Sequence, residues 1–345
     1  NLAMSVGAAK QRFIDYRKML YDLEPDTLAH GLDAFYLEDA NIRLPHPLGD
    51  VVGATALHRT GYAPLLHAIS DLERRDYISV GGMNGETVWI GTGGYYTGVF
   101  ERPFLDIPPT RHLVSMRYME FFAFEGERIK TARLLWDIPS LMMQADAWPM
   151  SPSLGVEWHV PGPATLDGVI NTESDEAHSA ASLQLVEDMV AGLERFGEGG
   201  AEAMNLEQFW HPKMNWYGPA GIGSMRRLSG FRNWHQIPFL SCIPDRSANT
   251  DDGDYDCYFA DGDYVAFCGW PAIDATVTGD GWMGIAPGGK KLKVTSLDFW
   301  RCENGLLREN WVLIDILDIW HQLGVDVLRR MRETTFARQP LDFKP

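Results

Sequence analysis

The sequence predicts an α+β fold in which two similar domains follow one another, each with three helices ahead of a curled antiparallel sheet. The chain has 345 residues, a length typical of two domains. A shift of 178 positions aligns residues 91–144 with residues 269–322 without a gap, and ten of the 54 pairs are identical. Both copies also show the same order of element types. Helices followed by a sheet, twice over, indicate tandem α+β domains.

The front of each copy has helical periodicity. Apolar residues recur at i, i+3 and i+4 spacing in the first segment of each copy, which predicts an amphipathic helix there. A break rich in acidic residues or glycine, a short amphipathic segment and a third helix follow. The predicted helices are 10–23, 28–35 and a third near 54–69 in the first copy, and 182–196, 201–210 and a third near 231–240 in the second.

The back of each copy is rich in β-branched and aromatic residues divided by Gly, Pro and Asn, which is typical of antiparallel hairpins. The predicted strands are 86–91, 93–100, 113–124 and 129–136, then 264–269, 272–278, 292–302 and 307–314. Residues 149–180 are rich in Pro, Gly, Ser and Asp, as linkers are, and we expect part of them to pack on a surface. The predicted domains are therefore 8–148 and 181–335.

Composition narrows the classes of partner. The net charge is −17, which argues against nucleic acid because a basic face is needed to displace phosphate counterions. No apolar run is long enough to cross a membrane and no signal peptide is evident, so we expect a cytoplasmic protein without a membrane partner. The four cysteines form no Cys-x-x-Cys pair and are expected to be buried thiols. The acidic run 251–256 lacks the Gly at the sixth position and the closing Glu of an EF-hand loop, and is interpreted as a solvated hairpin or the entry to a strand.

Several motifs of the chain carry a family resemblance. The second copy contains Ile285-Ala-Pro-Gly-Gly, Asp298-Phe-Trp-Arg, Glu309-Asn-Trp-Val-Leu-Ile-Asp and Gln322-Leu-Gly, and the first has weaker counterparts. Together they resemble the SnoaL-like polyketide cyclases, which have an NTF2-like fold. The resemblance implies a cone-shaped pocket in each domain for a small hydrophobic or aromatic molecule, and acid/base chemistry without a cofactor. It also implies that the two copies pack together as a pseudo-dimer, and a homodimer of the whole chain stays open.

The resemblance does not extend to the catalytic positions of the cyclases. The inward aspartate of the last strand falls at Leu134 and Val312, which cannot transfer a proton. The inward histidine of the preceding strand falls at Asp298 in the second copy, and at Met119 or Glu120 in the first. Two hypotheses follow: an enzyme of cyclase or isomerase type that acts on a hydrophobic carbonyl compound, or a non-catalytic ligand-binding or scaffolding protein.

The candidate catalytic residues are Asp298 and His235. A carboxylate inside an apolar cone would have a raised pKa, as a general acid or base near neutral pH requires. Asp298 and Glu120 both lie among apolar neighbours, but strand alternation could instead turn either side chain to the outer face. Counted from Gly53 and Gly230, His58 and His235 fall at matching places in the third helix; each either points into the cone or packs elsewhere.

Further candidate ligand contacts come from polar and aromatic residues near these positions. Asn310 lies two residues before Val312, the position of the family's catalytic aspartate, so its side chain should point to the same face of the strand. The alternative is that its amide is hydrogen-bonded within the core. Asp137 and Asp315 follow the last strand of each copy and are also candidate ligand contacts. The alternative is that each caps the N-terminus of the next helix. Trp216 and Trp300 could stack on a flat ligand. No group of residues has the spacing of a metal site.

Overall fold

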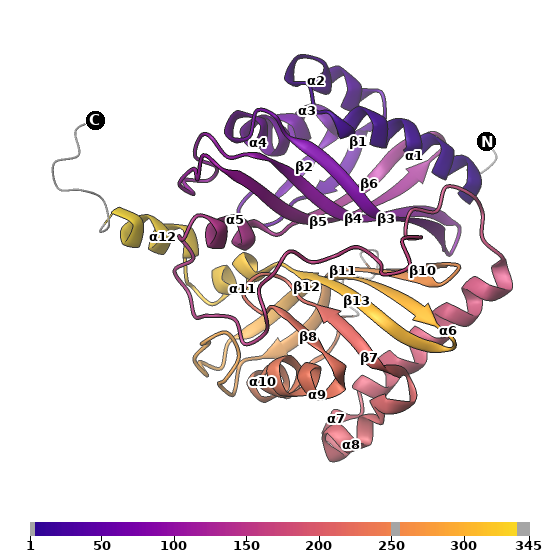
Figure 1. Ribbon diagram of the computed structural model, residues 1–345, viewed down its shortest axis with the longest axis vertical. Helices are drawn as coiled ribbons and strands as arrows, with labels where there is room; N and C mark the ends of the chain where they lie inside the picture. The colour runs from indigo at the N-terminus through magenta and orange to yellow at the C-terminus, as the bar shows by residue number, and fades with distance from the viewer. Residues whose placement is uncertain (1–3, 250–255, 337–345) are drawn as a thin grey trace.

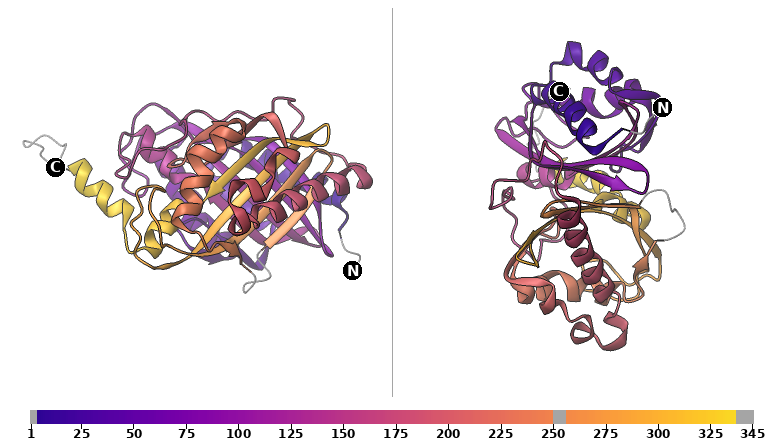
Figure 2. Two further views of the ribbon diagram at one scale, coloured as in Figure 1. Left: turned by 90° about the horizontal axis from the view of Figure 1, so that it is seen from below. Right: turned by 90° about the vertical axis from the view of Figure 1, so that its right-hand side faces the viewer.

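The computed structural model describes residues 4–249 and 256–336. Two sheets pack against each other in the middle of the molecule, with helices α1 to α4 (within residues 6–68) on the outer side of the first sheet and α7 to α10 (within residues 196–242) on the outer side of the second (Figure 1). The right-hand view of Figure 2 shows the same two layers from another side. The α+β fold with two separate sheets is therefore confirmed.

The first sheet has six strands in the order β2-β1-β6-β5-β4-β3. Its strands pair antiparallel except β1 and β6, which are parallel. The elements of this half are α1 (Val6–Tyr21), α2 (Pro25–Asp33), β1 (Tyr36–Arg43), β2 (Asp50–Val52), α3 (Gly53–Leu57), the π-helical turn η1 (His58–Tyr62), α4 (Ala63–Ala68), β3 (Glu73–Asn84), β4 (Thr87–Val99), β5 (Leu113–Glu125), β6 (Arg128–Trp136) and α5 (Ile138–Gln144).

The second sheet repeats this plan in the order β10-β11-β12-β13-β7-β8, with β9 paired to β11. Here β7 and β13 form the parallel pair. The elements are α6 (Glu176–Leu193), α7 (Phe196–Gly199), α8 (Ala201–Met204), the 3₁₀ turn η2 (Leu206–Gln208), β7 (Trp210–Tyr217), β8 (Ser224–Arg226), α9 (Arg227–Phe231), the π-helical turn η3 (Arg232–Gln236), α10 (Ile237–Cys242), β9 (Ser247–Ala248), β10 (Asp256–Asp261), β11 (Tyr264–Thr276), β12 (Lys291–Glu303), β13 (Leu306–Ile314), α11 (Ile316–Gln322) and α12 (Val327–Phe336).

The internal repeat has two different offsets. The bounds of β5, β6 and α5 coincide with those of β12, β13 and α11 after the predicted shift of 178. The elements β1, β2, α3, η1 and α4 instead coincide with β7, β8, α9, η3 and α10 after a shift of 174. The predicted equivalence of His58 and His235 is therefore wrong: His58 corresponds to Arg232, and His235 corresponds to Gly61. Counting from glycines failed because Gly53 and Gly230 are not equivalent.

Other differences concern the strands. The paired runs predicted at 86–100 and 264–278 are single long strands, β4 and β11. Strands β1, β3, β7 and β10 were not predicted. Buried and exposed side chains do not alternate regularly along β1, β3 and β7, and β3 and β10 contact each other across the two domains. The sheets are also not purely antiparallel, since the first and last strands of each domain run the same way. Most of the acidic run 251–256 lies outside the described residues.

The inner faces of the two sheets form one apolar layer between the domains. Phe121 of β5 stacks on its equivalent, Phe299 of β12, with ring centroids 5.3 Å apart and planes 10° from parallel. Arg117 of β5 donates hydrogen bonds to the carbonyls of Tyr217 and Val312 in the other domain. Burial of these side chains on both sheets holds the two halves together.

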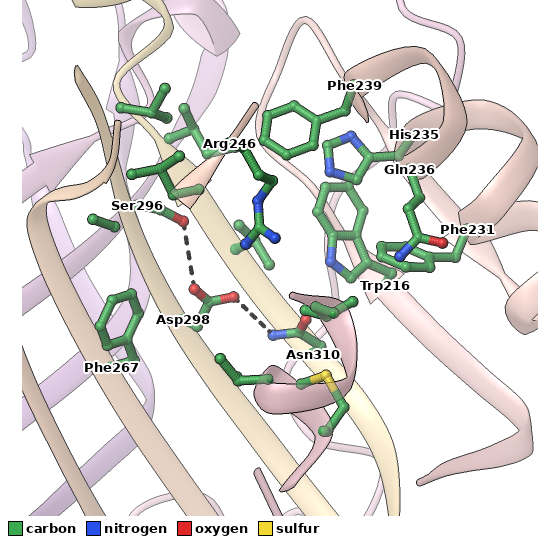
Figure 3. A pocket seen from close by; sticks show the side chains of 18 of the residues that line it. Trp216, Phe231, His235, Gln236, Phe239, Arg246, Phe267, Ser296, Asp298 and Asn310 are labelled. Atoms are coloured by element: carbon green, nitrogen blue, oxygen red, sulfur yellow. Dashed lines mark hydrogen bonds between the residues drawn. The ribbon is translucent and has the colours of Figure 1, made fainter. Parts of the chain in front are cut away.

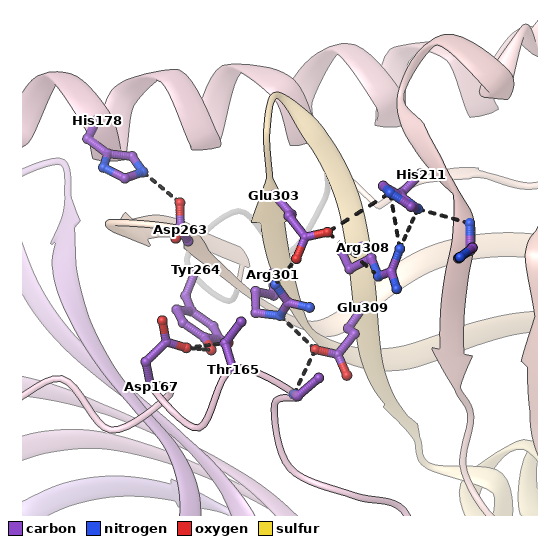
Figure 4. A network of polar contacts seen from close by, with 12 residues as sticks. Thr165, Asp167, His178, His211, Asp263, Tyr264, Arg301, Glu303, Arg308 and Glu309 are labelled. Atoms are coloured by element: carbon purple, nitrogen blue, oxygen red, sulfur yellow. Dashed lines mark hydrogen bonds and ion pairs between the residues drawn. The ribbon is translucent and has the colours of Figure 1, made fainter.

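The segment between the domains lies along both sheets. Val156 pairs with Ser224 and Val169 pairs with Ser79 in isolated bridges. Figure 4 shows how buried charges fix this segment: Arg301 lies between Glu303 and Glu309, and Glu309 accepts the backbone N–H of Ala164 at 3.2 Å. The predicted packing of part of this segment on a surface is thus observed.

Two kinds of feature are absent from the part of the chain that the structure describes. Within residues 4–249 and 256–336, no helix combines the length and the apolar character needed to span a membrane. The same residues contain no group of three or more His, Cys, Asp or Glu side chains arranged to hold a metal ion.

Candidate functional site

The second domain contains a cavity of about 340 Å³ between the concave face of its sheet and the helices that cover it. This volume lies in the range of small-molecule sites. Its walls come from α6, β7, the α9–η3–α10 segment and strands β11 to β13. Most of the wall is aromatic or aliphatic, and a few polar side chains point inward (Figure 3).

Strand alternation places the polar residues of the sheet wall. On β12, Ser296, Asp298 and Trp300 line the cavity, whereas the intervening Leu297 and Phe299 belong to the layer between the domains. This follows from the period of two residues along a strand. On β13, Asn310 and Val312 line the cavity by the same rule, and Val312 pairs directly with Asp298.

Asp298 is the acidic group of the sheet wall. Asn310 donates its Nδ2 to Asp298 Oδ1 at 3.2 Å, and the Ser296 hydroxyl donates to Oδ2 at 3.4 Å. Burial among apolar side chains raises the pKa of Asp298 to about 7, against the lowering effect of these two hydrogen bonds. Asp298 can therefore both accept and release a proton near neutral pH. The predicted inward orientation of Asp298 and Asn310 is the one observed.

The opposite wall is built around the π-helical turn η3, which ends just before Pro238. Proline has no N–H for a regular helical bond and its ring crowds the preceding turn, and Pro64 follows η1 at the equivalent position. The turn directs His235 into the cavity, where its ring stacks on Trp216 with centroids 4.3 Å apart. The ring of Phe239 stacks on the same histidine at 5.3 Å.

His235 is neutral at physiological pH. Burial, and secondly the positive charge of Arg246, lower its pKa to about 3. Its Nδ1 atom has no hydrogen-bond partner among the residues that the structure describes. An imidazole with this pKa does not act as a charged proton donor near neutral pH. It can still donate or accept one hydrogen bond to a ligand, so the predicted catalytic role of His235 is narrowed to that of a neutral imidazole.

Other buried polar atoms of residues that line the cavity also have no hydrogen-bond partner within residues 4–249 and 256–336. A buried polar group is normally hydrogen-bonded, so these atoms are candidate contacts for a ligand. These atoms are Nε1 of Trp210, Oε1 of Gln236, Nε of Arg246 and Nε1 of Trp300. The predicted site residues Trp216 and Trp300 thus both lie in the cavity wall.

The equivalent space in the first domain is filled. Trp136 occupies the position of Ile314, and a Cβ atom built on Gly61 would come within 3.2 Å of its ring. The Trp136 indole donates to Glu120 Oε2 at 2.8 Å, and the hydroxyl of Tyr96 donates to the same oxygen at 3.0 Å. Arg74 forms an ion pair with Glu120.

Glu120 is therefore the equivalent of Asp298, but it is a closed structural group. Its exposed fraction is 0%, and all its partners are side chains of its own domain. The predicted inward orientation of Glu120 is observed, whereas the predicted ligand contact does not follow, because protein side chains occupy the space that a ligand would need.

Three other predicted residues lie outside the cavity. Asp315 occupies the N-cap of α11 and accepts the N–H of Asp318 at 3.2 Å, so it is a helix cap as the alternative interpretation held. Asp137 occupies the N-cap position of α5 and accepts the N–H of Ala220 in the other domain at 3.0 Å. His58 is half-buried on η1 of the first domain. None of them contacts the other candidates.

Sequence reasoning missed several cavity residues. Ser296 could have been predicted, because it lies two residues from Asp298 on the same strand and so points to the same face. Arg246 and Gln236 gave no signal of their own, since neither belongs to a regular periodic pattern. The residues that α6 contributes, such as Met189, depend on how that helix crosses the sheet, which no local pattern specifies.

Comparison with known proteins agrees with this geometry. Residues 198–323 match the family model of the SnoaL-like polyketide cyclases. This match lies in the second domain, which holds the cavity, and the first domain repeats the order of elements of the second. A search of curated proteins gave no match for this chain.

Solved structures of single domains resemble parts of the chain. IdmH from Streptomyces antibioticus is 25% identical, with a TM-score of 0.31, over 40% of this chain and 98% of its own. TsrD from Streptomyces laurentii is 25% identical, with a TM-score of 0.33, over 44% and 98%. An NTF2-like protein from Burkholderia xenovorans LB400 is 14% identical, with a TM-score of 0.31, over 42% and 96%.

Proposed function

We propose that the second domain binds a flat hydrophobic carbonyl compound and that Asp298 moves a proton to or from the carbon next to its carbonyl group. The reaction class is cofactor-free acid/base chemistry of the cyclase or isomerase type. The observation that carries this proposal is a carboxyl group with a pKa of about 7 in the wall of an apolar cavity of about 340 Å³.

The walls fit a flat ligand. Trp216 of β7 stacks with His235 of η3, which stacks in turn with Phe239 of α10, and Phe267 and Trp300 line the same cavity from β11 and β12. Aromatic side chains favour offset stacking and edge contacts with flat rings. A ring held between these walls would lie beside Asp298, which Figure 3 shows on the sheet side of the cavity.

The surroundings of Asp298 suit a general base. Asn310 and Ser296 hold its carboxylate in place through hydrogen bonds to different oxygens. A proton abstracted from carbon leaves an enolate oxygen, which hydrogen-bond donors in a dry site stabilise. The unpaired indole N–H groups of Trp210 and Trp300 are such donors in the same wall.

Hydrogen–deuterium exchange on a model ketone tests the proposal. The whole chain is incubated with 1-tetralone in D₂O, and loss of the protons beside the carbonyl is followed by proton NMR. We expect exchange above the buffer rate for the wild type and a loss of at least about 100-fold in that enhancement for Asp298→Asn. The matched control is Asp315→Asn, since Asp315 is also a buried carboxyl with a pKa of about 7 but caps a helix outside the cavity.

A non-catalytic binding role is the second candidate. It is favoured by Val312, which faces Asp298 across the strand pair and offers no second acid or base. Saturable binding of 1-tetralone without any exchange above the buffer rate would establish this role and rule out the enzymatic one.

A further inference from the structure

We infer that the natural ligand of this cavity carries a carboxylate group and that Arg246 is its counter-ion. This inference rests on the proposed function, because it concerns the contents of the same cavity. It adds the substrate class: a hydrophobic, acceptor-rich carboxylic acid rather than a neutral ketone or ester.

Arg246 reaches the cavity from the segment between α10 and β9. The backbone before it is held by Asp245, whose carboxylate accepts the N–H of Thr276 at 2.8 Å. The Arg246 guanidinium carbon lies 6.0 Å from the ring centroid of Phe239. Figure 3 shows the guanidinium group directed into the space between Asp298 and Trp216.

This guanidinium group forms no ion pair with a carboxylate among the described residues, although the charge of Glu194, which also lines the cavity, acts on it from a greater distance. Within residues 4–249 and 256–336, no acidic oxygen lies within 4.0 Å of it, and its Nε is buried without a hydrogen bond. Two fully buried arginines of the chain, Arg74 and Arg301, do form such pairs, with Glu120 and Glu309. Arg246 is half-buried, and a charge partly removed from water is costly unless it is paired, so this position fits a ligand that brings the opposite charge.

The remaining polar atoms of the wall also favour an acceptor-rich ligand. The unpaired donors are the indole N–H groups of Trp210 and Trp300 and the Nε–H of Arg246, whereas Gln236 Oε1 is an unpaired acceptor. A carboxylate and a carbonyl together supply acceptors for these donors. The planar guanidinium group matches the geometry of a carboxylate, which can accept two parallel hydrogen bonds from it.

Arg246 and Asp298 both border the space between the sheet and Trp216 that Figure 3 shows. The charge of Arg246 contributes to the lowered pKa of His235, but the pKa of Asp298 responds to burial, Asn310 and Ser296. The two groups also form no ion pair. A ligand can therefore bind its carboxylate on the helical side at Arg246 and present its carbonyl side to Asp298.

A pair of isosteric probes tests the inference by isothermal titration calorimetry on the whole chain. The probes are 2-naphthoate, which is anionic, and 2-acetonaphthone, in which a methyl ketone replaces the carboxylate. We expect 2-naphthoate to bind the wild type at least about tenfold more tightly. Arg246→Gln should weaken 2-naphthoate at least about tenfold and change 2-acetonaphthone less than about threefold. Arg246→Lys should lie between, because it keeps the charge but loses the planar fork.

The controls separate this inference from the proposed function. Arg329→Gln, at a residue 73% exposed on α12, should change neither affinity. Equal affinities for the acid and the ketone, or an equal loss of both in Arg246→Gln, would overturn the carboxylate inference and leave exchange at Asp298 intact. Absence of binding by both probes, or unchanged binding of both when Ile314→Trp fills the cavity, would overturn both proposals.

Discussion

Asp137 and Asp315 occupy equivalent positions in the two domains, and each accepts a hydrogen bond from the backbone of the other domain. Asp137 Oδ2 accepts the N–H of Ala220, and Asp315 Oδ2 accepts the N–H of His46, both at 3.0 Å. Ala220 and His46 are themselves equivalent under the shift of 174 residues. This reciprocity is the signature of an isologous interface, here formed within one chain.

The first prediction concerns this reciprocal contact. Asp315→Ala should lower the free energy of unfolding by about 1–3 kcal/mol, because it leaves the buried N–H groups of His46 and Asp318 without an acceptor. Asp315→Asn should cost less than Asp315→Ala, because its single amide oxygen still accepts one of these two N–H groups, which bond to different carboxylate oxygens in the wild type. Urea unfolding followed by tryptophan fluorescence measures both. Equal losses for the two variants would contradict the role of the acceptor.

The second prediction concerns the pH dependence of stability. Burial raises the folded-state pKa of Asp298 to about 7, above the unfolded value near 3.8. The folded state thus binds this proton more tightly, so its contribution to stability is complete below about pH 4 and is lost as the pH rises to about 7.

Asp298→Asn should therefore flatten the pH profile between pH 4 and 7. At pH 8 it should be more stable than the wild type by up to about 4 kcal/mol, because the folded and unfolded pKa values differ by about 3 and a difference of one corresponds to about 1.4 kcal/mol. Urea unfolding at several pH values checks this. Asp26→Asn, at an exposed residue of α2, is the control and should leave the profile unchanged. A profile for Asp298→Asn as steep as that of the wild type would count against the buried carboxyl.

The third prediction concerns the pH dependence of the proposed exchange reaction. A general base acts in its ionised form, so the exchange rate of 1-tetralone should rise about tenfold per pH unit below about pH 7 and level off above it. His235 should contribute no second inflection in this range, since its pKa is about 3. Rates corrected for buffer exchange from pH 5 to 9 provide the test. A rate that falls with rising pH would assign the group as an acid instead.

The fourth prediction concerns a substitution that places the tryptophan of the first domain, Trp136, at the equivalent position 314 of the second domain. Ile314→Trp should abolish probe binding by filling the cavity, and it should also destabilise the domain, since His235 stands where Gly61 accommodates the ring of Trp136. The double variant Ile314→Trp/His235→Gly should recover about 1–3 kcal/mol of the lost stability without recovering binding. Thermal unfolding and calorimetric titration with 2-naphthoate measure the two effects. If the double variant is no more stable than Ile314→Trp alone, the two positions do not restrict each other as proposed.

The sequence by itself determined the α+β class, the tandem repeat and the strands that carry the site. These follow from local patterns, since strand alternation and turn residues act over a few neighbours. Side chains two residues apart on a strand point to the same face, and this rule alone places Asp298, Trp300 and Asn310 on one face of two paired strands.

Only the tertiary structure decided which domain contains a cavity. Asp298 and Glu120 are equivalent in sequence, yet one lines open space and the other is enclosed by Arg74 and Trp136. Likewise, the pKa of His235 and the unpaired state of Arg246 depend on what helices α6 and α10 and the sheet leave between them. Burial, cavities and charge pairing are long-range properties of packing, and neighbouring residues in the chain do not specify them.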